Sequence, residues 1–116
     1  MTGIQDLYRA LSSQKFVLDN EKHIQSQIEK FLISADIKHN REFVLSKGNI
    51  IDFMVGDIGI EVKLKCSKRH IFRQCTRYME HDAIKSLLLV SATFMGLPEE
   101  INGKPIYILS LTKSWL

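Results

Sequence analysis

The chain has 116 residues, the length of one domain, and its 16 basic and 13 acidic side chains give a net charge of +3. Hydrophobic residues make up 45% and charged residues 25%, a globular composition that argues against disorder and fibrous repeats. No apolar run approaches the roughly 20 residues that span a bilayer, and the start of the chain lacks the basic and apolar parts of a leader, so we expect a cytoplasmic protein.

The first third of the chain predicts two helices. Thr2 can serve as an N-cap, and the apolar residues that follow it at helical spacing predict a short helix over residues 3–13. Asp19 and Asn20 supply a second N-cap, and apolar positions 24, 28, 31 and 32 mark one face of a helix near residues 20–34.

The middle of the chain changes to the alternation of β-strands. Strands are expected over residues 41–45, 50–55 and 60–65, because turn segments at 47–49 and 56–59 separate them. Three consecutive strands joined by such short turns form an antiparallel meander.

The last part of the chain predicts a helix between strands. A helical pattern over residues 68–81 is followed at 87–90 by a continuous apolar run, which is typical of a strand buried on both faces. A strand, a helix and a buried strand in succession predict a right-handed parallel crossover. We expect a helical turn over residues 97–101, beginning near Pro98, and a last strand over 105–111 at a sheet edge, where proline is tolerated.

The expected fold is therefore a mixed α/β (α+β) domain over residues 1–116 with the element order α-α-β-β-β-α-β-(α)-β. Residues 1–18 are expected to form an N-terminal helical extension, residues 19–92 the core and residues 93–116 a C-terminal strand region. The apolar tail, which includes Trp115, is equally suited to the core and to a homodimer interface.

One strand pair carries the chemistry. Asp52 is the single charged residue of an apolar strand segment, and a buried carboxylate needs a partner. Glu61 and Lys63 follow across the expected hairpin and, two residues apart, emerge on the same strand face. If the hairpin pairs these strands, Asp52 and Glu61 can share one Mg²⁺, and the main-chain carbonyl of Val62 is the candidate third ligand. Lys63 would then orient or deprotonate the attacking water and offset charge on a phosphate.

Less specific interpretations of these residues stay open. Glu61 and Lys63 can be solvent-facing residues of a half-exposed strand. Asp52 can pair with Arg41 or make a capping contact.

The two cysteines, Cys66 and Cys75, are expected to be reduced thiols, because a secreted disulfide scaffold of this size carries more cysteines. Together with His70 they lack the paired spacing of zinc ligands such as C-x₂-C, so we expect no zinc site.

The motif resembles that of the PD-(D/E)xK nuclease superfamily, and most closely its RecB-type, VRR-type and Holliday-junction-resolvase-like members. The resemblance covers residues 19–92 and rests on Asp52 and the triplet Glu61-Val62-Lys63, placed between a helix and a basic helix. Ile51 stands where the proline that names the superfamily would be, and many members lack that proline.

The resemblance implies a restriction-endonuclease-like fold, with a mixed sheet flanked by helices. It implies that Asp52 and Glu61 bind Mg²⁺, for which Mn²⁺ can substitute, and that Lys63 serves the attacking water. Gln74 and Tyr78 form a Q-x-x-x-Y that resembles the motif after E-x-K in RecB-type nucleases. Four residues apart, they lie on one helical face, suited to touch substrate or to brace the lysine.

A further carboxylate is often added from the first core helix of the superfamily, and Glu21 fits best. It lies on the helix face that packs against the sheet, but a favourable charge in the first turn of a helix explains it equally well. Glu29 is expected to be rotated toward solvent, and Glu42 and Asp57 to be surface residues.

The segment after the candidate site is basic. Three arginines recur every four residues and, with two lysines, form a stripe that can follow a phosphate backbone. Pairing of the arginines with Glu80 and Asp82, or plain solvation, is the alternative. The expected nucleic-acid-binding residues are Lys65, Lys68, Arg69, Arg73, Arg77 and Tyr78.

The sequence thus predicts a Mg²⁺-dependent DNA nuclease that hydrolyses phosphodiesters, with Glu21 and Gln74 in support of the three motif residues. No element resembles a base-reading module, which favours a structure-specific endonuclease for branched DNA, acting as a homodimer or as a subunit of a larger DNA-processing complex. A non-catalytic nucleic-acid-binding module and a protein-interaction domain for an acidic partner are the alternatives.

Overall fold

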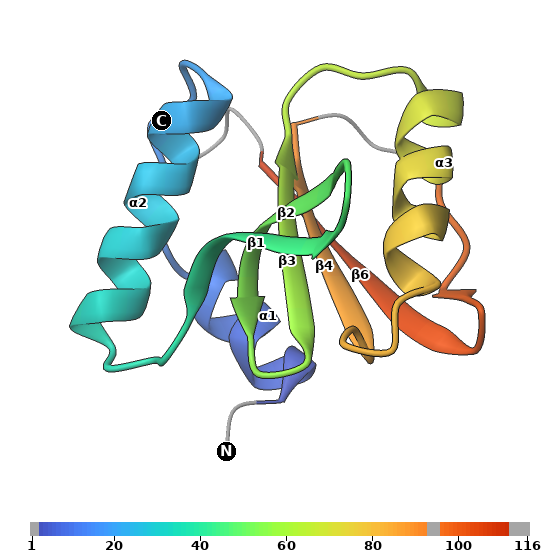
Figure 1. Ribbon diagram of the computed structural model, residues 1–116. Coiled ribbons are helices and arrows are strands. Elements are labelled where there is room, and N and C mark those ends of the chain that lie inside the picture. The colour runs from blue at the N-terminus through green and yellow to red at the C-terminus, as the bar shows by residue number, and fades with distance from the viewer. Residues whose placement is uncertain (1–2, 93–95, 112–116) are drawn as a thin grey trace.

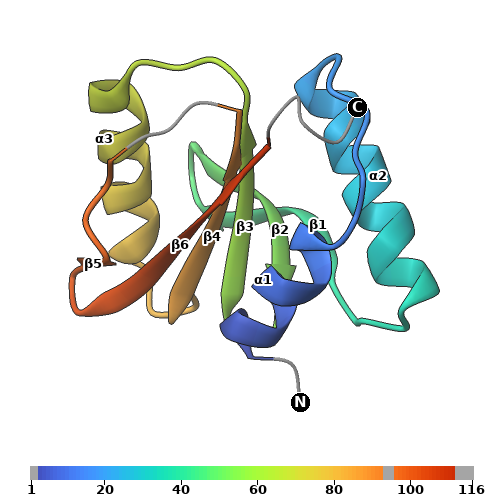
Figure 2. The same cartoon turned by 180° about the vertical axis from the view of Figure 1, so that it is seen from behind.

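The computed structural model describes residues 3–92 and 96–111, which form an α+β fold of three helices and a six-stranded mixed sheet (Figure 1). Helices α1 (Ile4–Ser12) and α2 (Glu21–Ser34) pack on one face of the sheet, and α3 (Lys68–Met79) packs on the other. The view from behind shows α1 crossing the sheet (Figure 2). None of the helices in the described residues is both long and apolar enough to cross a membrane.

Six strands make up the sheet. They are β1 (Asn40–Ser46), β2 (Asn49–Val55), β3 (Ile58–Lys63), β4 (Ser86–Ser91), β5 (Glu100–Ile101) and β6 (Lys104–Ser110), in the spatial order β1-β2-β3-β4-β6-β5. The first three form the expected antiparallel meander, β4 and β6 join in parallel, and β5 is antiparallel to β6.

Side-chain caps fix the starts of two helices. The Asn20 side chain accepts a hydrogen bond from the His23 N–H at 2.8 Å, and Ser67 accepts one from the His70 N–H at 3.1 Å. Each cap satisfies an N–H that the first helical turn leaves without a backbone partner. The caps hold α2 and α3 in the segments expected for them.

The N-terminal helix belongs to the main core. Leu7 and Leu11 of α1 are fully buried and pack with apolar residues of α2 and of the sheet. The helix of the N-terminal extension therefore packs in the same core as α2 and the sheet. Thr2, its expected N-cap, lies outside the described residues, and Gly3 takes the capping position without a side-chain hydrogen bond.

The parallel crossover from β3 through α3 to β4 is confirmed. All residues of β4 are buried, because α1 contacts the strand from one face and α3 from the other. β3 runs parallel to β4, so both strands end at the upper edge of the sheet in Figure 1, where α3 also begins. The end of the candidate motif is thus at an open edge of the sheet, beside the basic helix.

The C-terminal region corrects one expectation. Residues 97–101 form no helical turn: their last two residues are strand β5, which pairs with the start of β6. Asn102 and Gly103 both have positive φ and make a two-residue turn, and Asn-Gly is a strong hairpin signal that outweighs the helix start suggested by Pro98. β6 is therefore an edge strand only beyond its first two residues.

The apolar tail is core as far as it is described. Ile106, Leu109 and Leu111 are buried under the helices of the two faces. Trp115 and the rest of residues 112–116 lie outside the described part, so the interface expected there is not assessed by the structure.

The hairpin that joins β2 and β3 is tighter than expected. Its turn consists of Gly56 and Asp57 alone, so β3 covers Ile58–Lys63 and not residues 60–65. Val55 pairs with Ile58, and this register brings position 52 opposite position 61 when it is continued by three steps. The hairpin thereby sets the alignment of the two candidate carboxylates.

Gly59 permits this close packing. A Cβ at position 59 would lie 2.5 Å from the Ile51 side chain and 3.3 Å from those of Ile84 and Leu87. We expect Gly59→Ala to lower the free energy of unfolding by about 1–3 kcal/mol, measured by denaturant titration, because overpacking strains a dense core. Val44→Ile, which adds one carbon to a side chain that is 61% exposed, is the control, and equal stability of the two variants would contradict the packing described here.

Candidate active site

Asp52 and Glu61 exchange hydrogen bonds with each other's strands. The ladder between β2 and β3 pairs Phe53 with Ile60 and extends no further toward the upper edge. Beyond it, the Asp52 N–H donates to Glu61 Oε1 at 3.2 Å, and the Val62 N–H donates to Asp52 Oδ2 at 2.8 Å. The two carboxylates therefore act as backbone acceptors at the point where the strands separate.

Lys63 completes the cluster from the same strand face. Its Nζ lies 3.8 Å from Glu61 Oε2, and its side chain is 24% exposed while that of Glu61 is 4% exposed. One group thus faces solvent and the other the protein interior. The structure brings the three motif residues together, and their chemical roles remain predictions.

An irregularity in β2 directs Asp52 to this position. Successive side chains of a regular strand alternate, so Ile51 and Phe53 should share a face. Phe53 instead packs with α1 and α2, and Ile51 packs with α3. The β1–β2 ladder also skips the pair of Asp52 and Glu42, and Glu42 has φ of +52°. The alternation of side chains is therefore interrupted at Asp52, and this interruption lets the Asp52 carboxylate reach the Val62 N–H.

Glu21 joins the cluster from α2. Its Oε2 accepts a hydrogen bond from the Leu64 N–H at 3.0 Å, just after the end of β3. The contact ties the first turn of α2 to the edge of the sheet, and the charge of Glu21 is close enough to raise the pKa of Asp52. The structure thus places Glu21 beside the motif residues, where it anchors backbone.

Burial and mutual repulsion disfavour two negative charges here. Burial, and then the charge of Asp52, raise the pKa of Glu61 from 4.5 to about 8, although Lys63 lowers it. Burial also raises the pKa of Asp52, against the Val62 N–H and Lys63, which lower it. A cation shared by the two carboxylates would offset both effects.

The donor set fits an ion that keeps most of its water. In the described residues no three His, Cys, Asp or Glu side chains are grouped as a metal site, and the Glu21 carboxylate accepts a backbone N–H instead. Mg²⁺ is commonly held by one or two carboxylates together with water and substrate phosphate oxygens. The Val62 carbonyl adds an oxygen on the side of Asp52, because the N–H and C=O of a residue in an extended strand point the same way.

Gln74 and Tyr78 of α3 lie against β2, next to the candidate site. Gln74 Nε2 donates to the Tyr78 hydroxyl at 3.0 Å, and that hydroxyl donates to the Ile50 carbonyl, also at 3.0 Å. Tyr78 is 2% exposed, so the prediction that it contacts nucleic acid is wrong: its ring fills the core beneath β2. Gln74 Oε1 is buried without a hydrogen-bond partner, and Gln74 makes no bond to Lys63 among the described contacts.

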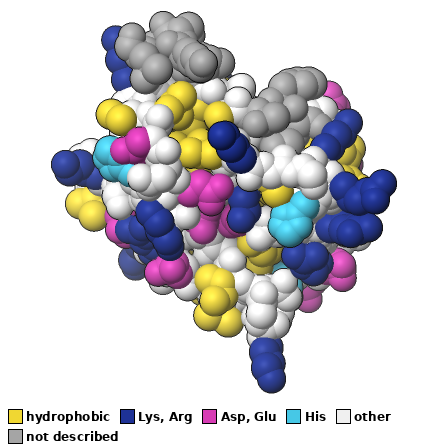
Figure 3. All heavy atoms as spheres, turned by 90° about the horizontal axis from the view of Figure 1, so that it is seen from above, with side chains coloured by type: hydrophobic (Ala, Val, Ile, Leu, Met, Phe, Trp, Pro, Cys, Tyr) yellow, Lys and Arg dark blue, Asp and Glu magenta, His cyan; other side chains and the backbone are white. Residues whose placement is uncertain are grey.

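The cations expected to contact DNA form no ion pair with a carboxylate in the described residues. Arg69, Arg73 and Arg77 are exposed on α3, and none pairs with an acidic group in the described part of the chain, so the alternative of pairing with Glu80 and Asp82 is wrong. Lys65 and Lys68 are exposed in the loop and at the helix start. Figure 3 looks down on the upper edge of the sheet in Figure 1. Acidic side chains lie at the centre of this view, with Lys and Arg side chains on either side of them.

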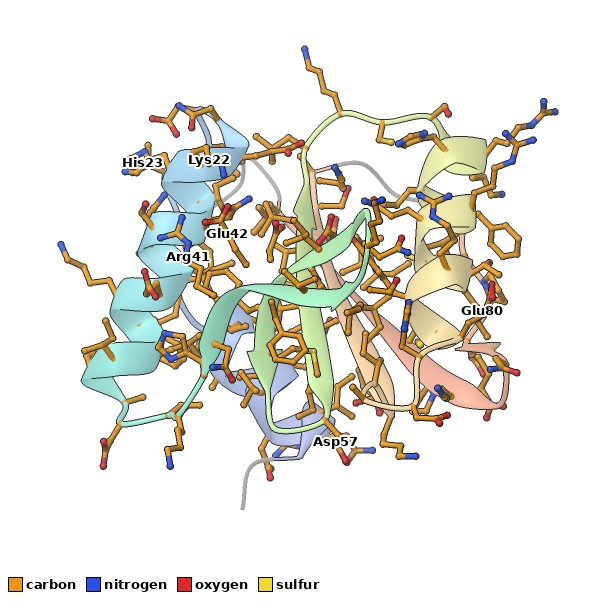
Figure 4. All side chains as sticks on the ribbon, viewed as in Figure 1. Lys22, His23, Arg41, Glu42, Asp57 and Glu80 are labelled. Atoms are coloured by element: carbon orange, nitrogen blue, oxygen red, sulfur yellow. The ribbon has the colours of Figure 1, made fainter. Side chains whose placement is uncertain are left out.

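A second ionic cluster was missed by sequence reasoning. Glu29, expected in solvent, accepts hydrogen bonds from Arg41 Nη1 at 2.9 Å and lies 3.1 Å from His39 Nε2. Arg41 therefore binds α2 and does not pair with Asp52, which rules out that alternative (Figure 4). Glu29 is ten residues from His39 and twelve from Arg41 in the sequence, so no local pattern predicts these contacts.

One further cation stands near the carboxylates. Lys22, in the first turn of α2, lies 3.7 Å from Glu42 and lowers the pKa of Asp52 by its charge. The position of Lys22 directly after Glu21 in the sequence could have predicted a cation near the site. Glu42 and Asp57 are exposed, as expected.

Comparisons with family models, with curated proteins and with solved structures find no match for this chain. Any functional conclusion therefore rests on the arrangement of Asp52, Glu61 and Lys63.

The raised pKa of Glu61 predicts a pH-dependent stability. The native state binds this proton more tightly than the unfolded chain, so the free energy of unfolding should fall as pH rises from about 4.5 to about 8. We expect the thermal midpoint of the metal-free protein to drop between pH 5 and pH 8 by roughly 5 °C or more relative to Glu61→Gln. Glu80→Gln, an exposed control, should keep the wild-type dependence. A parallel pH profile for Glu61→Gln and wild type would contradict the burial described for this carboxyl.

Proposed function

We propose that this protein is a divalent-metal-dependent DNA nuclease of the PD-(D/E)xK kind, with a restriction-endonuclease-like core. The observation that carries the proposal is the meeting of Asp52 and Glu61 across two separating strands, with Lys63 3.8 Å from Glu61. A mixed sheet flanked by helices is also what the resemblance implies. A solvent-facing E-x-K would leave Glu61 exposed, and Glu61 is 3% exposed.

The proposed metal ligands are the carboxylates of Asp52 and Glu61 and the carbonyl of Val62. When bound, Mg²⁺ would supply positive charge to the phosphate oxygens and acidify water. The buried Glu61 and the half-buried Asp52 hold their positions through the two backbone hydrogen bonds, so little rearrangement would accompany the reaction.

Lys63 is proposed to act on the water and the phosphate. Its ammonium group can hold the attacking water by a hydrogen bond and offset the charge that develops on phosphorus-bound oxygens. Hydrolysis adds this water across one P–O bond of the backbone. Glu21 and Gln74 are proposed as positioning residues, since one holds the backbone after Lys63 and the other holds Tyr78 under β2.

The proposed substrate is DNA with a branched or otherwise irregular structure. The α3 cations, which form no ion pair in the described residues, lie beside the sheet edge that holds the carboxylates and favour a polyanion. None of the described elements is a base-reading module. Cutting both strands of a junction would need two copies or a larger complex. A non-catalytic nucleic-acid-binding module on the same fold is the second candidate, favoured only by the α3 cations.

Cleavage assays separate the two candidates. Labelled linear, circular, flapped and four-way DNA would be incubated with the protein in Mg²⁺ or Mn²⁺. We expect cleavage that falls by about 100-fold or more in Asp52→Asn and Lys63→Met, because each removes a group that acts on the reacting phosphate. Asp57→Asn and Lys38→Met are matched surface controls that should cut normally.

The outcome that contradicts the nuclease proposal is equally defined. If the wild-type protein binds DNA but cuts none of the substrates in the presence of metal, it is a binding module. Cutting that survives Asp52→Asn would assign the activity to other residues or to a contaminant.

Salt dependence tests the proposed DNA-binding role of α3. Each phosphate contact adds about 0.9 to the slope of log affinity against log salt on duplex DNA. We therefore expect the double variant Arg73→Gln, Arg77→Gln to reduce the magnitude of the slope by about 2, measured by fluorescence anisotropy. Lys30→Gln, Lys38→Gln is the control, and equal slopes for the two double variants would remove α3 from the DNA interface.

A further inference from the structure

A groove on α3 lies outside the carboxylate site. It has a volume of about 440 Å³ and runs between the first turns of α3 and the segment that begins at Gly96. Figures 1 and 2 both show that segment alongside α3. We call it the Phe72 groove, and its lining residues are Lys68, Arg69, Phe72, Gly96, Leu97 and Pro98.

Phe72 gives the groove an open aromatic surface. It is 41% exposed, and it is the one aromatic among the large exposed hydrophobic residues of the described chain. At 100° per residue, Phe72 stands about 160° around the helix from Gln74, so it is on the opposite flank of α3 from the carboxylates. The groove is therefore a separate feature and no part of the candidate active site.

Positive charge surrounds this aromatic surface. Lys68 is one helical turn before Phe72, and Arg69 lines the groove beside it. Neither cation pairs with a carboxylate in the described residues. An exposed aromatic side chain with two cations in the same lining matches a nucleotide, whose base is flat and apolar on its faces and whose phosphates are anionic.

A basic path leads from the carboxylate site to the groove. Lys63 ends β3, Lys65 is exposed in the connecting loop, and Lys68 opens α3. Phe72 follows about 6 Å farther along the helix axis. A DNA strand held at the carboxylates could place successive phosphates on these lysines and then a base in the groove.

We propose that the Phe72 groove is a stacking site for an unpaired base of the substrate strand, with Lys68 and Arg69 on its flanking phosphates. This inference rests on the proposed DNA function and specifies its substrate class. Bases inside a duplex are already stacked on their neighbours, so the groove accepts only a single-stranded or extruded nucleotide. The preferred substrate is therefore DNA with an unpaired stretch beside the cut, such as a flap or a junction.

The test uses oligonucleotides that carry 2-aminopurine at one position, whose fluorescence falls when the base stacks. All variants are made in an Asp52→Asn background, so that binding is measured in Mg²⁺ without cutting. We expect quenching at defined positions of a single-stranded or flapped oligonucleotide. We expect Phe72→Ala to abolish it and to weaken that affinity by roughly 5- to 150-fold, with duplex affinity changed less than twofold.

Two further substitutions separate stacking from packing. Phe72→Trp should retain both quenching and affinity, whereas Phe72→Leu, which keeps an apolar side chain without a π-face, should behave like Phe72→Ala. Val44→Ala, at another exposed apolar residue, is the control and should bind as the parent protein does. Circular dichroism and thermal melts check that each variant folds.

Several results would overturn the inference. Unchanged affinity and quenching in Phe72→Ala, or full affinity in Phe72→Leu, would show that no base stacks there. If the protein is a dimer that Phe72→Ala dissociates without a change in DNA affinity, the groove is an interface with a second copy of the chain. Cutting of DNA by the protein without the background substitution, measured in parallel, shows whether the proposed function fails together with the groove or stands without it.

Discussion

The arrangement of the site depends on two carboxylates that replace the backbone ladder where β2 and β3 separate. Asp52 and Glu61 each accept an N–H from the opposite strand, at 2.8 and 3.2 Å. These bonds hold the carboxylates close together in a largely buried place, where two negative charges repel each other and lack water. Lys63 at 3.8 Å offsets part of that charge. A bound divalent cation would offset the remainder, so the contacts that fix the geometry would also favour the binding of a cation.

The rest of the fold maintains this separation. Glu21 holds the backbone after Lys63, and α2 is in turn fixed to β1 by the contact of Arg41 with Glu29. On the other face, the Tyr78 hydroxyl binds the Ile50 carbonyl, two residues before Asp52. Both helices that flank the site thus bond to backbone near the carboxylates, which limits how far the strands can move.

Local pattern was sufficient for the three helices, for the meander and for the alignment of the motif. The apolar period changes from helical to alternating at the start of the meander, and a short turn leaves few ways to align Asp52 with Glu61. The turn residues Asn102 and Gly103 also predict the hairpin at this position, and they are a stronger signal than the helix start at Pro98.

Long-range contacts explain what the pattern could not give. Glu29 was expected in solvent because the helical count places it off the sheet-facing side, but Arg41 and His39, ten or more residues away, cover it. Tyr78 has the spacing of a substrate contact, yet the packing of α3 on β2 buries it. The irregularity of β2 at Asp52 arises because Ile51 and Phe53 pack in the cores on opposite faces of the sheet. No residue type in the strand predicts this change.

Binding of Mn²⁺ tests the central claim most directly, because electron paramagnetic resonance distinguishes free from bound ion without any substrate. We predict one bound Mn²⁺ per chain in the wild-type protein at pH 8, displaced by Mg²⁺, and loss of that binding in Asp52→Asn with folding retained. Wild-type protein that binds no Mn²⁺, or Asp52→Asn that binds it equally well, would contradict the assignment of this carboxylate pair as a metal site.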